Sequence, residues 1–226
     1  AEATMLRLTC ERAQIEDGMR ILELGCGWGS LSLWMAEHYP NATIHSVSNS
    51  ASQKAWIDGQ AAERNLGNLQ IQTCDMNDFE PEGEFDRVVS VEMFEHMKNW
   101  ELLISKLNGV MAEGAKLFLH VFSHRIHAYH FLKENDDEWM AKHFFSGGMM
   151  PSHQIFDCLQ TPLSLESSWF VNGTHYQKTS DHWLENMHKQ RSEIMPILES
   201  TYGHREAKRW FHRWRIFFIA CRGRDG

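Results

Sequence analysis

Three alternate glycines after a short apolar run constrain this chain more than any other feature of its sequence. Ile21-Leu22-Glu23-Leu24 leads into Gly25-Cys26-Gly27-Trp28-Gly29, and Ser30 follows. The apolar run is long enough for a buried strand, and glycines after a strand let the backbone turn tightly and approach a ligand closely. The pattern predicts a strand, a turn and a helix that begins at Ser30. This arrangement is typical of a nucleotide-cofactor site, and a tight turn without a ligand is the alternative.

The spacing of these glycines and the position of the nearest acid argue against a nicotinamide dinucleotide. The dinucleotide fingerprint is Gly-x-Gly-x-x-Gly, with an acid about twenty residues later that holds a ribose hydroxyl. Here the spacing is Gly-x-Gly-x-Gly, and the next apolar segment, residues 43–47, ends in Ser48-Asn49-Ser50. The acid instead precedes the glycines, at Glu23. From there a carboxylate can reach the ammonium group of an amino-acid-like cofactor such as S-adenosylmethionine.

Composition limits the architecture and the kind of partner. With 226 residues, of which 42% are hydrophobic, the chain is expected to form one domain over residues 1–226. We expect a cofactor-binding core over about 15–125 and a helical cap with the remaining sheet elements over about 126–226. The net charge of −8 argues against nucleic acid or an anionic membrane surface as the main partner. A neutral or cationic small molecule fits better.

The cysteines and the apolar segments indicate the compartment. Five cysteines lie far apart without a Cys-x-x-Cys pair, which suits neither a disulfide framework nor a zinc site. No apolar stretch approaches the roughly 20 residues of a membrane span, and the first residues do not have the pattern of a signal peptide. We therefore expect a cytoplasmic protein without stable membrane insertion.

Strand-like and helix-like segments alternate in the first half of the chain. Ser50 is a good helix N-cap, and several alanines favour a helix from Ser50 to Arg64. This alternation predicts an α/β fold with a doubly wound, mostly parallel sheet, in which ligands bind at the carboxyl ends of the strands. The five segments expected to form its strands are residues 20–24, 43–47, 69–73, 86–91 and 116–122.

Acidic residues follow the third and fourth predicted strands. Asp75-Met76 follows the third, where an acid can bind the amino group of an adenine and an apolar side chain can cover its ring. A cap on the next helix is an equally good interpretation of Asp75. After the fourth strand, Glu92, Glu95 and His96 place two carboxylates and an imidazole within five residues. Such acids can simply favour the start of a helix, but their position at a strand end favours catalysis.

Four histidines lie within eleven residues at the end of the fifth predicted strand. They are His120, His124, His127 and His130. A metal site is one interpretation, but no His-Glu-x-x-His pattern accompanies them, and we expect none. An imidazole near its free pKa accepts a proton at physiological pH, so a general base is the better interpretation for one of the four.

The second half of the chain, from about Glu134, is rich in aromatic residues and methionine and predicts a helical cap. Within it, Leu163–Val171 is expected to form a sixth strand, and Ser180–Glu199 and His204–Ala220 to form amphipathic helices. A stripe of methionine and aromatic residues usually packs in a core, and it can also line an apolar substrate pocket. The residues expected in the core of the cap are Trp183, Met187, Ile194, Ile197 and Leu198.

Four segments carry a resemblance to a known family. They are Leu22–Ser30, Asn49–Lys54, Phe85–Arg87 and Val91–Asn99. Together they resemble the cyclopropane fatty acid synthase-like methyltransferases, most closely the coclaurine N-methyltransferase branch, and the likeness extends over nearly the whole chain.

The resemblance implies a class I, Rossmann-like methyltransferase that uses S-adenosyl-L-methionine. Bicarbonate is implied only for a cyclopropane synthase. The implied cofactor residues, besides Glu23, are Gly25, Gly27 and Gly29 at the methionine end, Ser48, Asn49 and Gln53 near the ribose, Asp75 and Met76 around the adenine, and Val91 below the sulfonium methyl.

Four further residues match the catalytic positions of the family. Glu95, His120 and Tyr176 match its polar reaction-chamber positions, and His124 matches the base of an N-methyltransferase. In-line methyl transfer requires an uncharged nucleophile, so an amine must first lose its proton. We expect His124, assisted by His120 or Glu95, to accept it.

These observations lead to one principal hypothesis and two alternatives. The principal one is a transferase that methylates the amine of a small, largely apolar or aromatic substrate. The first alternative is a lipid-modifying relative that methylates or cyclopropanates an unsaturated acyl chain. The second is a truncated, non-catalytic remnant that only binds the cofactor. A homodimer is compatible with all three.

Overall fold

The computed structural model describes residues 1–131, 139, 143–144 and 147–222, and these form two compact units. Unit 1 is Ala1–Ser164 and unit 2 is Leu165–Gly226. Part of the predicted cap, residues 132–138, 140–142, 145–146 and 223–226, lies outside the described residues.

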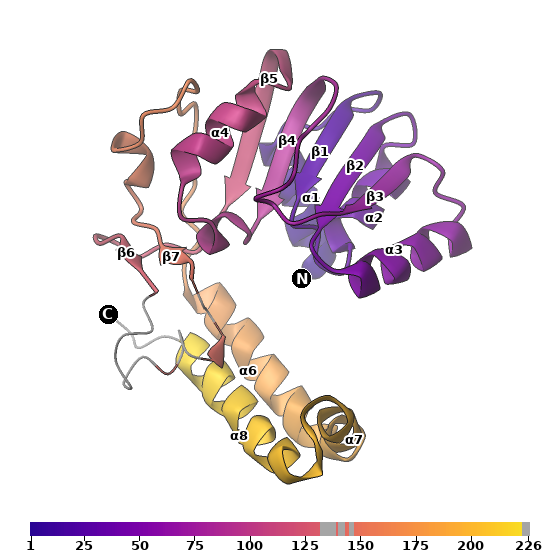
Figure 1. Cartoon of the computed structure of the whole chain (residues 1–226), viewed down its shortest axis with the longest axis vertical. Coiled ribbons are helices and arrows are strands. Elements are labelled where there is room, and N and C mark those ends of the chain that lie inside the picture. The colour runs from indigo at the N-terminus through magenta and orange to yellow at the C-terminus, as the bar shows by residue number, and fades with distance from the viewer. Residues whose placement is uncertain (132–138, 140–142, 145–146, 223–226) are drawn as a thin grey trace. The chain divides into compact units, whose positions relative to one another are not determined.

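Unit 1 contains a five-stranded parallel sheet, which confirms the predicted fold class. The strand order is β3-β2-β1-β4-β5, so the direction of winding reverses between β1 and β4 (Figure 1). Ligands of open parallel sheets bind at the carboxyl ends of the strands beside such a reversal. The strands are β1 (Arg20–Leu24), β2 (Thr43–Ser48), β3 (Leu69–Thr73), β4 (Phe85–Val91) and β5 (Met111–His120).

Helices cover both faces of this sheet, because alternate apolar side chains of each strand point to opposite faces. On one face, Ile21 and Ile44 pack with residues of α1 (Glu2–Arg12) and α2 (Ser30–His38), and α3 (Ala51–Glu63) packs beside α2. On the other face, Leu22 and Val88 pack against α4 (Trp100–Asn108), which lies in front of the sheet in Figure 1. Each fully buried Leu or Ile stabilises the fold by roughly 1.5–3 kcal/mol.

Helices α2 and α3 begin where the sequence predicts. Gly29 is the N-cap of α2, which starts at Ser30, and Ser50 is the N-cap of α3. The Ser50 hydroxyl accepts a hydrogen bond from the Gln53 N–H at 3.4 Å, which satisfies one of the free N–H groups of the first turn. The first turns of both helices therefore lie at the carboxyl ends of β1 and β2.

The predicted bounds of the fifth strand, 116–122, were wrong at both ends. Strand β5 starts earlier, at Met111, with a bulge opposite Phe85, and it ends at His120. Its end is set by hydrogen bonds outside the ladder: the His120 carbonyl accepts from Glu92 N, and Phe122 N donates to a carboxylate instead of a neighbouring strand.

Short elements follow β5 and β4. Strand β6 (Tyr129–His130) pairs antiparallel with β7 (Met149–Met150), and a single bridge joins His124 to Ser152. The 3₁₀ turns are η1 (Phe94–His96) and η2 (Ile155–Asp157).

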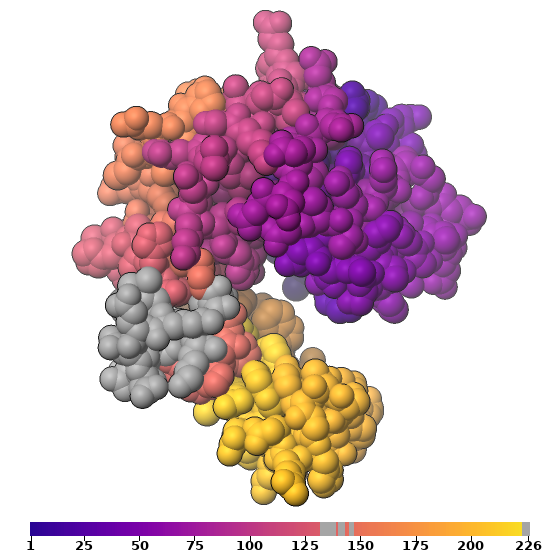
Figure 2. All heavy atoms as spheres, viewed as in Figure 1, coloured from indigo at the N-terminus to yellow at the C-terminus, as the bar shows by residue number. Residues whose placement is uncertain are grey.

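The described part of unit 2 contains three helices, and it corrects two predictions for the cap. The helices are α6 (Thr174–Lys189), α7 (Arg191–Tyr202) and α8 (His204–Cys221), and the atoms of α8 are yellow in Figure 2. The segment Leu163–Val171 is not a strand: it is fully described, and none of its residues pairs with another strand. Predicted helix Ser180–Glu199 is instead two helices that meet at Gln190.

The two helices that meet at Gln190 both pack against α8. Met187 and Leu198 belong to one buried cluster, with Ala207 and Phe211 of α8. Of the predicted core residues, Met187 and Leu198 are buried and Ile194 packs against them, but Trp183 and Ile197 are largely exposed, at 44% and 61%.

Candidate active site

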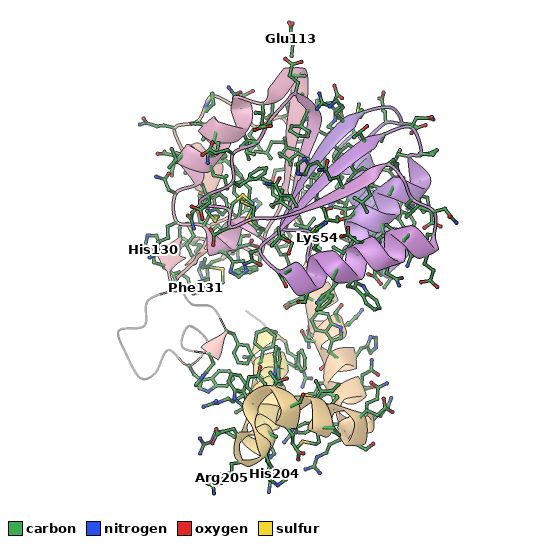
Figure 3. The ribbon with its side chains drawn as sticks, turned by 45° about the vertical axis from the view of Figure 1, so that its right-hand side comes forward. Lys54, Glu113, His130, Phe131, His204 and Arg205 are labelled. Atoms are coloured by element: carbon green, nitrogen blue, oxygen red, sulfur yellow. The ribbon has the colours of Figure 1, made fainter. Side chains whose placement is uncertain are left out.

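The carboxyl ends of the strands of unit 1 gather most of the predicted site residues. In Figure 3, Lys54 near the start of α3 and His130 and Phe131 at β6 lie toward this edge of the sheet, whereas Glu113 points into solvent at the opposite end of β5. The predicted residues of β1, β2, β4 and β5 therefore share one edge of a rigid sheet.

The glycine loop between β1 and α2 turns as its sequence predicts. Gly25, Gly27 and Gly29 have φ values of +77°, +53° and +84°, a region that residues with a Cβ rarely adopt. The backbone N–H groups of Gly25 and Cys26 both donate to the Val47 carbonyl at 3.0 Å, which fixes the loop to the end of β2.

Close packing adds a second requirement for glycine at two of these positions. A Cβ at Gly25 would lie 2.6 Å from the Met93 side chain, and one at Gly29 would lie 2.6 Å from Ile57. At Gly27, a Cβ would meet no described atom within 4 Å. Gly25 and Gly29 thus fit the loop between η1 and α3, and Gly27 leaves open space above the loop.

Glu23 is a buried carboxylate at the end of β1. Its Oε2 atom accepts hydrogen bonds from the hydroxyls of Ser32 at 2.5 Å and Ser46 at 2.8 Å, and the residue is 3% exposed. Burial raises the pKa of this carboxyl, and the two hydroxyl donors oppose the rise. The sequence singled out Glu23 but not its two serine partners, which lie on a different helix and strand.

The residues predicted near a ribose lie at the end of β2. Ser48 is buried, and its hydroxyl donates to Gln53 Oε1 at 2.6 Å and accepts from Ser50 N at 3.0 Å. Asn49 between them is exposed. The structure therefore brings Ser48 and Gln53 into contact and leaves Asn49 accessible to a ligand.

Asp75 and Met76 follow β3, as predicted. Asp75 is exposed, and its Oδ1 accepts from the backbone and side-chain N–H groups of Asn77, both at 2.8 Å. This carboxylate closes a turn rather than capping a helix, because the following residues form no helix. Met76 is half-buried against the cluster that includes Val47 and Phe79.

Val91 and His120 end the neighbouring strands β4 and β5 and are partners in the ladder. Both are half-buried. The next residue, Glu92, has φ +52°, which is rare for a residue with a Cβ, and its N–H donates to the His120 carbonyl at 2.8 Å. Residue type gives no signal of this strained backbone, so the sequence pointed to Glu92 only through its position.

Glu95 has the most unusual environment of the predicted site residues. It lies in η1 with 1% exposure, and its Oε1 accepts from Phe122 N at 2.8 Å. Its Oε2 is buried and has no hydrogen-bond partner among the described residues. Burial raises the pKa of Glu95 to about 7, and the negative charge of Glu92 is a smaller contribution in the same direction.

The backbone of Gly148 lies close to the backbone of Glu95. A Cβ at Gly148 would lie 2.1 Å from the Glu95 carbonyl oxygen, so only glycine fits there. The Gly148 carbonyl in turn accepts a hydrogen bond from Phe131 N at 2.9 Å. Sequence reasoning did not assign Gly148 a role, although a pair of glycines is a usable signal of a close backbone contact.

His124 is held on three sides by backbone groups. Its N–H donates to the Pro151 carbonyl at 2.8 Å, and its carbonyl accepts from His153 N at 3.0 Å. Its Nδ1 accepts from Ile126 N at 3.1 Å and from His127 N at 2.9 Å. His124 therefore joins the segment after β5 to the segment after β7.

Tyr176 is the one predicted catalytic residue in unit 2. It lies on α6, is 41% exposed, and its ring meets the edge of Trp183 at 6.1 Å. Both side chains line an apolar groove of about 620 Å³ within this unit, which also contains the amides of Asn186 and Gln190. The aromatic residues of the groove are Tyr176, Trp183, Trp214, Phe217 and Phe218.

The described residues provide neither a metal centre nor a membrane-spanning helix. No cluster of three or more His, Cys, Asp or Glu side chains among them could hold a metal ion. None of the helices in the described part of the chain has the length and apolar character needed to cross a bilayer.

Comparison with known proteins shows the family. The model of the mycolic acid cyclopropane synthetase family matches residues 1–223. The chain belongs to this family. Coclaurine and pavine N-methyltransferases of Thalictrum flavum subsp. glaucum are 37% identical over 224 residues and 36% identical over 223 residues, each match covering 97% of this chain.

A solved structure supports the same relationship. The crystal structure of a coclaurine N-methyltransferase bound to N-methylheliamine and SAH has a TM-score of 0.91 and 36% identity, covering 98% of this chain and 66% of the other. The chain spans 62% and 63% of the length of the two Thalictrum relatives. The resemblance found in the sequence is thus confirmed as family membership.

Proposed function

We propose that this chain is the catalytic part of an S-adenosylmethionine-dependent N-methyltransferase, which methylates the amine of a small, largely apolar or aromatic substrate. The observation that carries the proposal is the pairing of the glycine loop with Glu95 at one edge of the sheet. Family membership and the named activities of the relatives support it. The cytoplasmic location and the homodimer stay predictions.

The residues present fit the cofactor. The open space above Gly27 and the accessible Asn49 leave room at the carboxyl ends of β1 and β2. Glu23 and its serines offer a carboxylate near the loop for an ammonium group, and Ser48 with Gln53 offers polar groups for a ribose. When bound, S-adenosylmethionine supplies an electrophilic methyl group on a sulfonium.

The work left to the chain is to deprotonate, orient and desolvate the amine. Glu95 is the better proton acceptor: its Oε2 has no partner in the described residues, and its pKa of about 7 leaves much of it ionised at neutral pH. The sequence assigned this role to His124, whose Nδ1 lone pair is already used by two backbone N–H groups. His120, at the end of β5, would help to orient the amine.

The groove of unit 2, taken by itself, suits an apolar or aromatic small molecule. Its volume of about 620 Å³ lies within the range of small-molecule sites, and aromatic rings dominate its lining. Aromatic faces attract cationic ammonium groups and pack against apolar rings. An apolar or aromatic molecule therefore fits this groove, and Tyr176 is a polar side chain in its lining.

Calorimetric titration with S-adenosylmethionine and with its demethylated product tests the proposal first. Binding near the micromolar range, about −8 kcal/mol, followed by methyl transfer to amines in a panel of aromatic and aliphatic acceptors, is the expected result. Transfer to unsaturated phospholipid vesicles but not to amines would favour the lipid-modifying alternative. Tight binding without transfer to any acceptor would favour a non-catalytic remnant.

A further inference from the structure

The imidazole of His124 has one nitrogen that is fully used by the backbone. The N–H groups of Ile126 and His127 both donate to Nδ1, at 3.1 and 2.9 Å. A ring nitrogen that accepts hydrogen bonds carries no proton, and a neutral imidazole has a single proton. The proton of neutral His124 is therefore on Nε2, which makes Nε2 a hydrogen-bond donor.

This tautomer conflicts with a role as general base. To accept a proton, a neutral imidazole needs a free lone pair, and the only lone pair of His124 lies on Nδ1 between two N–H groups. Protonation there would break both hydrogen bonds and leave two backbone donors in repulsive contact with a cation. Nε2, the other nitrogen, already carries a proton.

The surroundings of His124 suggest what the imidazole does instead. Two residues before it, Phe122 N donates to Glu95 Oε1 at 2.8 Å. Its own backbone bonds to Pro151 and His153 hold the segment that follows Gly148, and Gly148 packs on the Glu95 carbonyl. His124 thus fastens together the two segments that contact Glu95 on either side.

We propose that His124 is a positioning residue, which closes the turn at 124–127 through Nδ1 and thereby keeps Phe122 N on the carboxylate of Glu95. The inference rests on the proposed function for its catalytic meaning, but its structural part stands on hydrogen bonds of this chain alone. The rings of His127, at 5.4 Å, and Tyr129, at 6.3 Å, pack on the His124 ring and hold it in place.

Two substitutions separate positioning from base catalysis. In His124→Asn, the side-chain carbonyl oxygen accepts backbone N–H groups two and three residues on, as in an Asx turn, but an amide does not take up a proton near neutral pH. In His124→Ala, both the acceptor and the base are lost. His127→Asn is the matched control, because it changes the neighbouring exposed ring and keeps the backbone N–H that bonds to Nδ1.

The first measurement is independent of methyl transfer. The Glu95 carboxyl is titrated by ¹³C NMR in the full chain and in the three variants. We expect His124→Ala to shift the Glu95 titration to higher pH, since the carboxylate loses the Phe122 N–H, and His124→Asn and His127→Asn to leave it near that of the unmodified chain. An unchanged titration in His124→Ala would overturn the proposal.

The second measurement is the pH profile of kcat for methyl transfer to an amine that the unmodified chain methylates. We expect His124→Asn to keep most of the activity and the same acidic limb, and His124→Ala to lose about 10²-fold, the loss that a small misplacement of a reacting group causes. If His124→Asn were as inactive as His124→Ala and the acidic limb disappeared, His124 would be the base. A chain that transfers no methyl group would contradict the proposed function, and the NMR titration would then decide the positioning role.

Discussion

The ends of β1 and β4 each carry a buried glutamate, and the two carboxylates differ in how their oxygens are satisfied. At the end of β1, Glu23 accepts two hydroxyl hydrogen bonds on one oxygen, from Ser32 and Ser46. Beyond β4, Glu95 accepts one backbone N–H on Oε1, and the structure describes no partner for its Oε2. Burial raises the pKa of both.

The difference indicates which of the two glutamates takes part in binding and which in proton transfer. Hydroxyl donors favour the charged form of a buried carboxylate against the effect of burial, and they fix its orientation. One with a free oxygen is destabilised in its charged form, and it gains most when it takes up a proton. We therefore associate Glu23 with binding and Glu95 with proton transfer.

The largest expected effect is on catalysis, in Glu95→Gln. The amide oxygen of the substituted side chain can still accept from Phe122 N, but an amide cannot take up a proton. We therefore expect kcat for amine methylation to fall by about 10²–10⁴-fold, the usual contribution of a general base. Glu23→Gln is the matched variant: it should raise KM for S-adenosylmethionine with a smaller change in kcat. Steady-state kinetics measure both, and equal losses of kcat in the two variants would remove the contrast.

The next effect is on stability, in the glycine loop. Gly29→Ala places a Cβ at φ +84° and 2.6 Å from Ile57. The backbone strain costs about 1–2 kcal/mol, and the overpacking adds about 1–3 kcal/mol. Gly27→Ala meets no atom of the described residues within 4 Å, so it should cost only the strain. Urea unfolding measures the free energy of unfolding of both variants. An equal loss of stability in the two would mean that the contact with Ile57 adds no cost.

The parts of this site that the sequence could predict are those determined by local backbone chemistry. Gly25, Gly27 and Gly29 indicate a turn because few other residues adopt a positive φ. Ser50 indicates the start of α3, because its hydroxyl can accept a hydrogen bond from the first turn of a helix. Strands β1 to β4 follow from short apolar runs between helical segments, and their parallel order follows from the alternation. Each of these signals is contained in a few consecutive residues.

The parts that the sequence could not predict depend on segments far apart in the chain. The environment of Glu95 requires Phe122 and Gly148, and that of His124 requires Pro151 and His153. The break at Gln190 separates two helices that both bury residues against α8, which lies further along the chain. The strand expected at Leu163–Val171 does not form, because apolar residues alone do not supply a neighbouring strand to pair with.

A third prediction uses the pH dependence of stability. The folded pKa of Glu95, about 7, lies above the value of 4.5 for a free glutamate. The protonated form is therefore favoured in the folded state, and its contribution is present below about pH 4.5 and lost as the pH rises through about 7. The shift corresponds to about 3 kcal/mol, so Glu95→Gln should gain about that much relative to the unmodified chain between pH 4 and pH 8.

Denaturant unfolding at several pH values measures this gain. Glu113→Gln removes the same charge from the exposed far end of β5 and controls for the change in net charge. A Glu95→Gln advantage that stayed constant from pH 4 to pH 8 would show that the Glu95 carboxyl titrates as it does in the unfolded chain.

The smallest expected effect concerns the satisfied carboxylate. Ser46→Ala removes one of the two hydroxyls that donate to Glu23 Oε2, and both groups are buried. Loss of a hydrogen bond to a buried acceptor costs about 1–3 kcal/mol, and the Glu23 pKa should rise further because one opposing donor is gone. Ser105→Ala, at an exposed position of α4, is the matched control and should change stability by less than about 0.5 kcal/mol.

Since Ser32 and Ser46 donate to the same oxygen, their effects should not add: a double-mutant cycle should show coupling of about 0.5–3 kcal/mol. Strictly additive losses would mean that the hydroxyls stabilise β2 and α2 separately, and the contrast between the two glutamates would then rest on Glu95 alone.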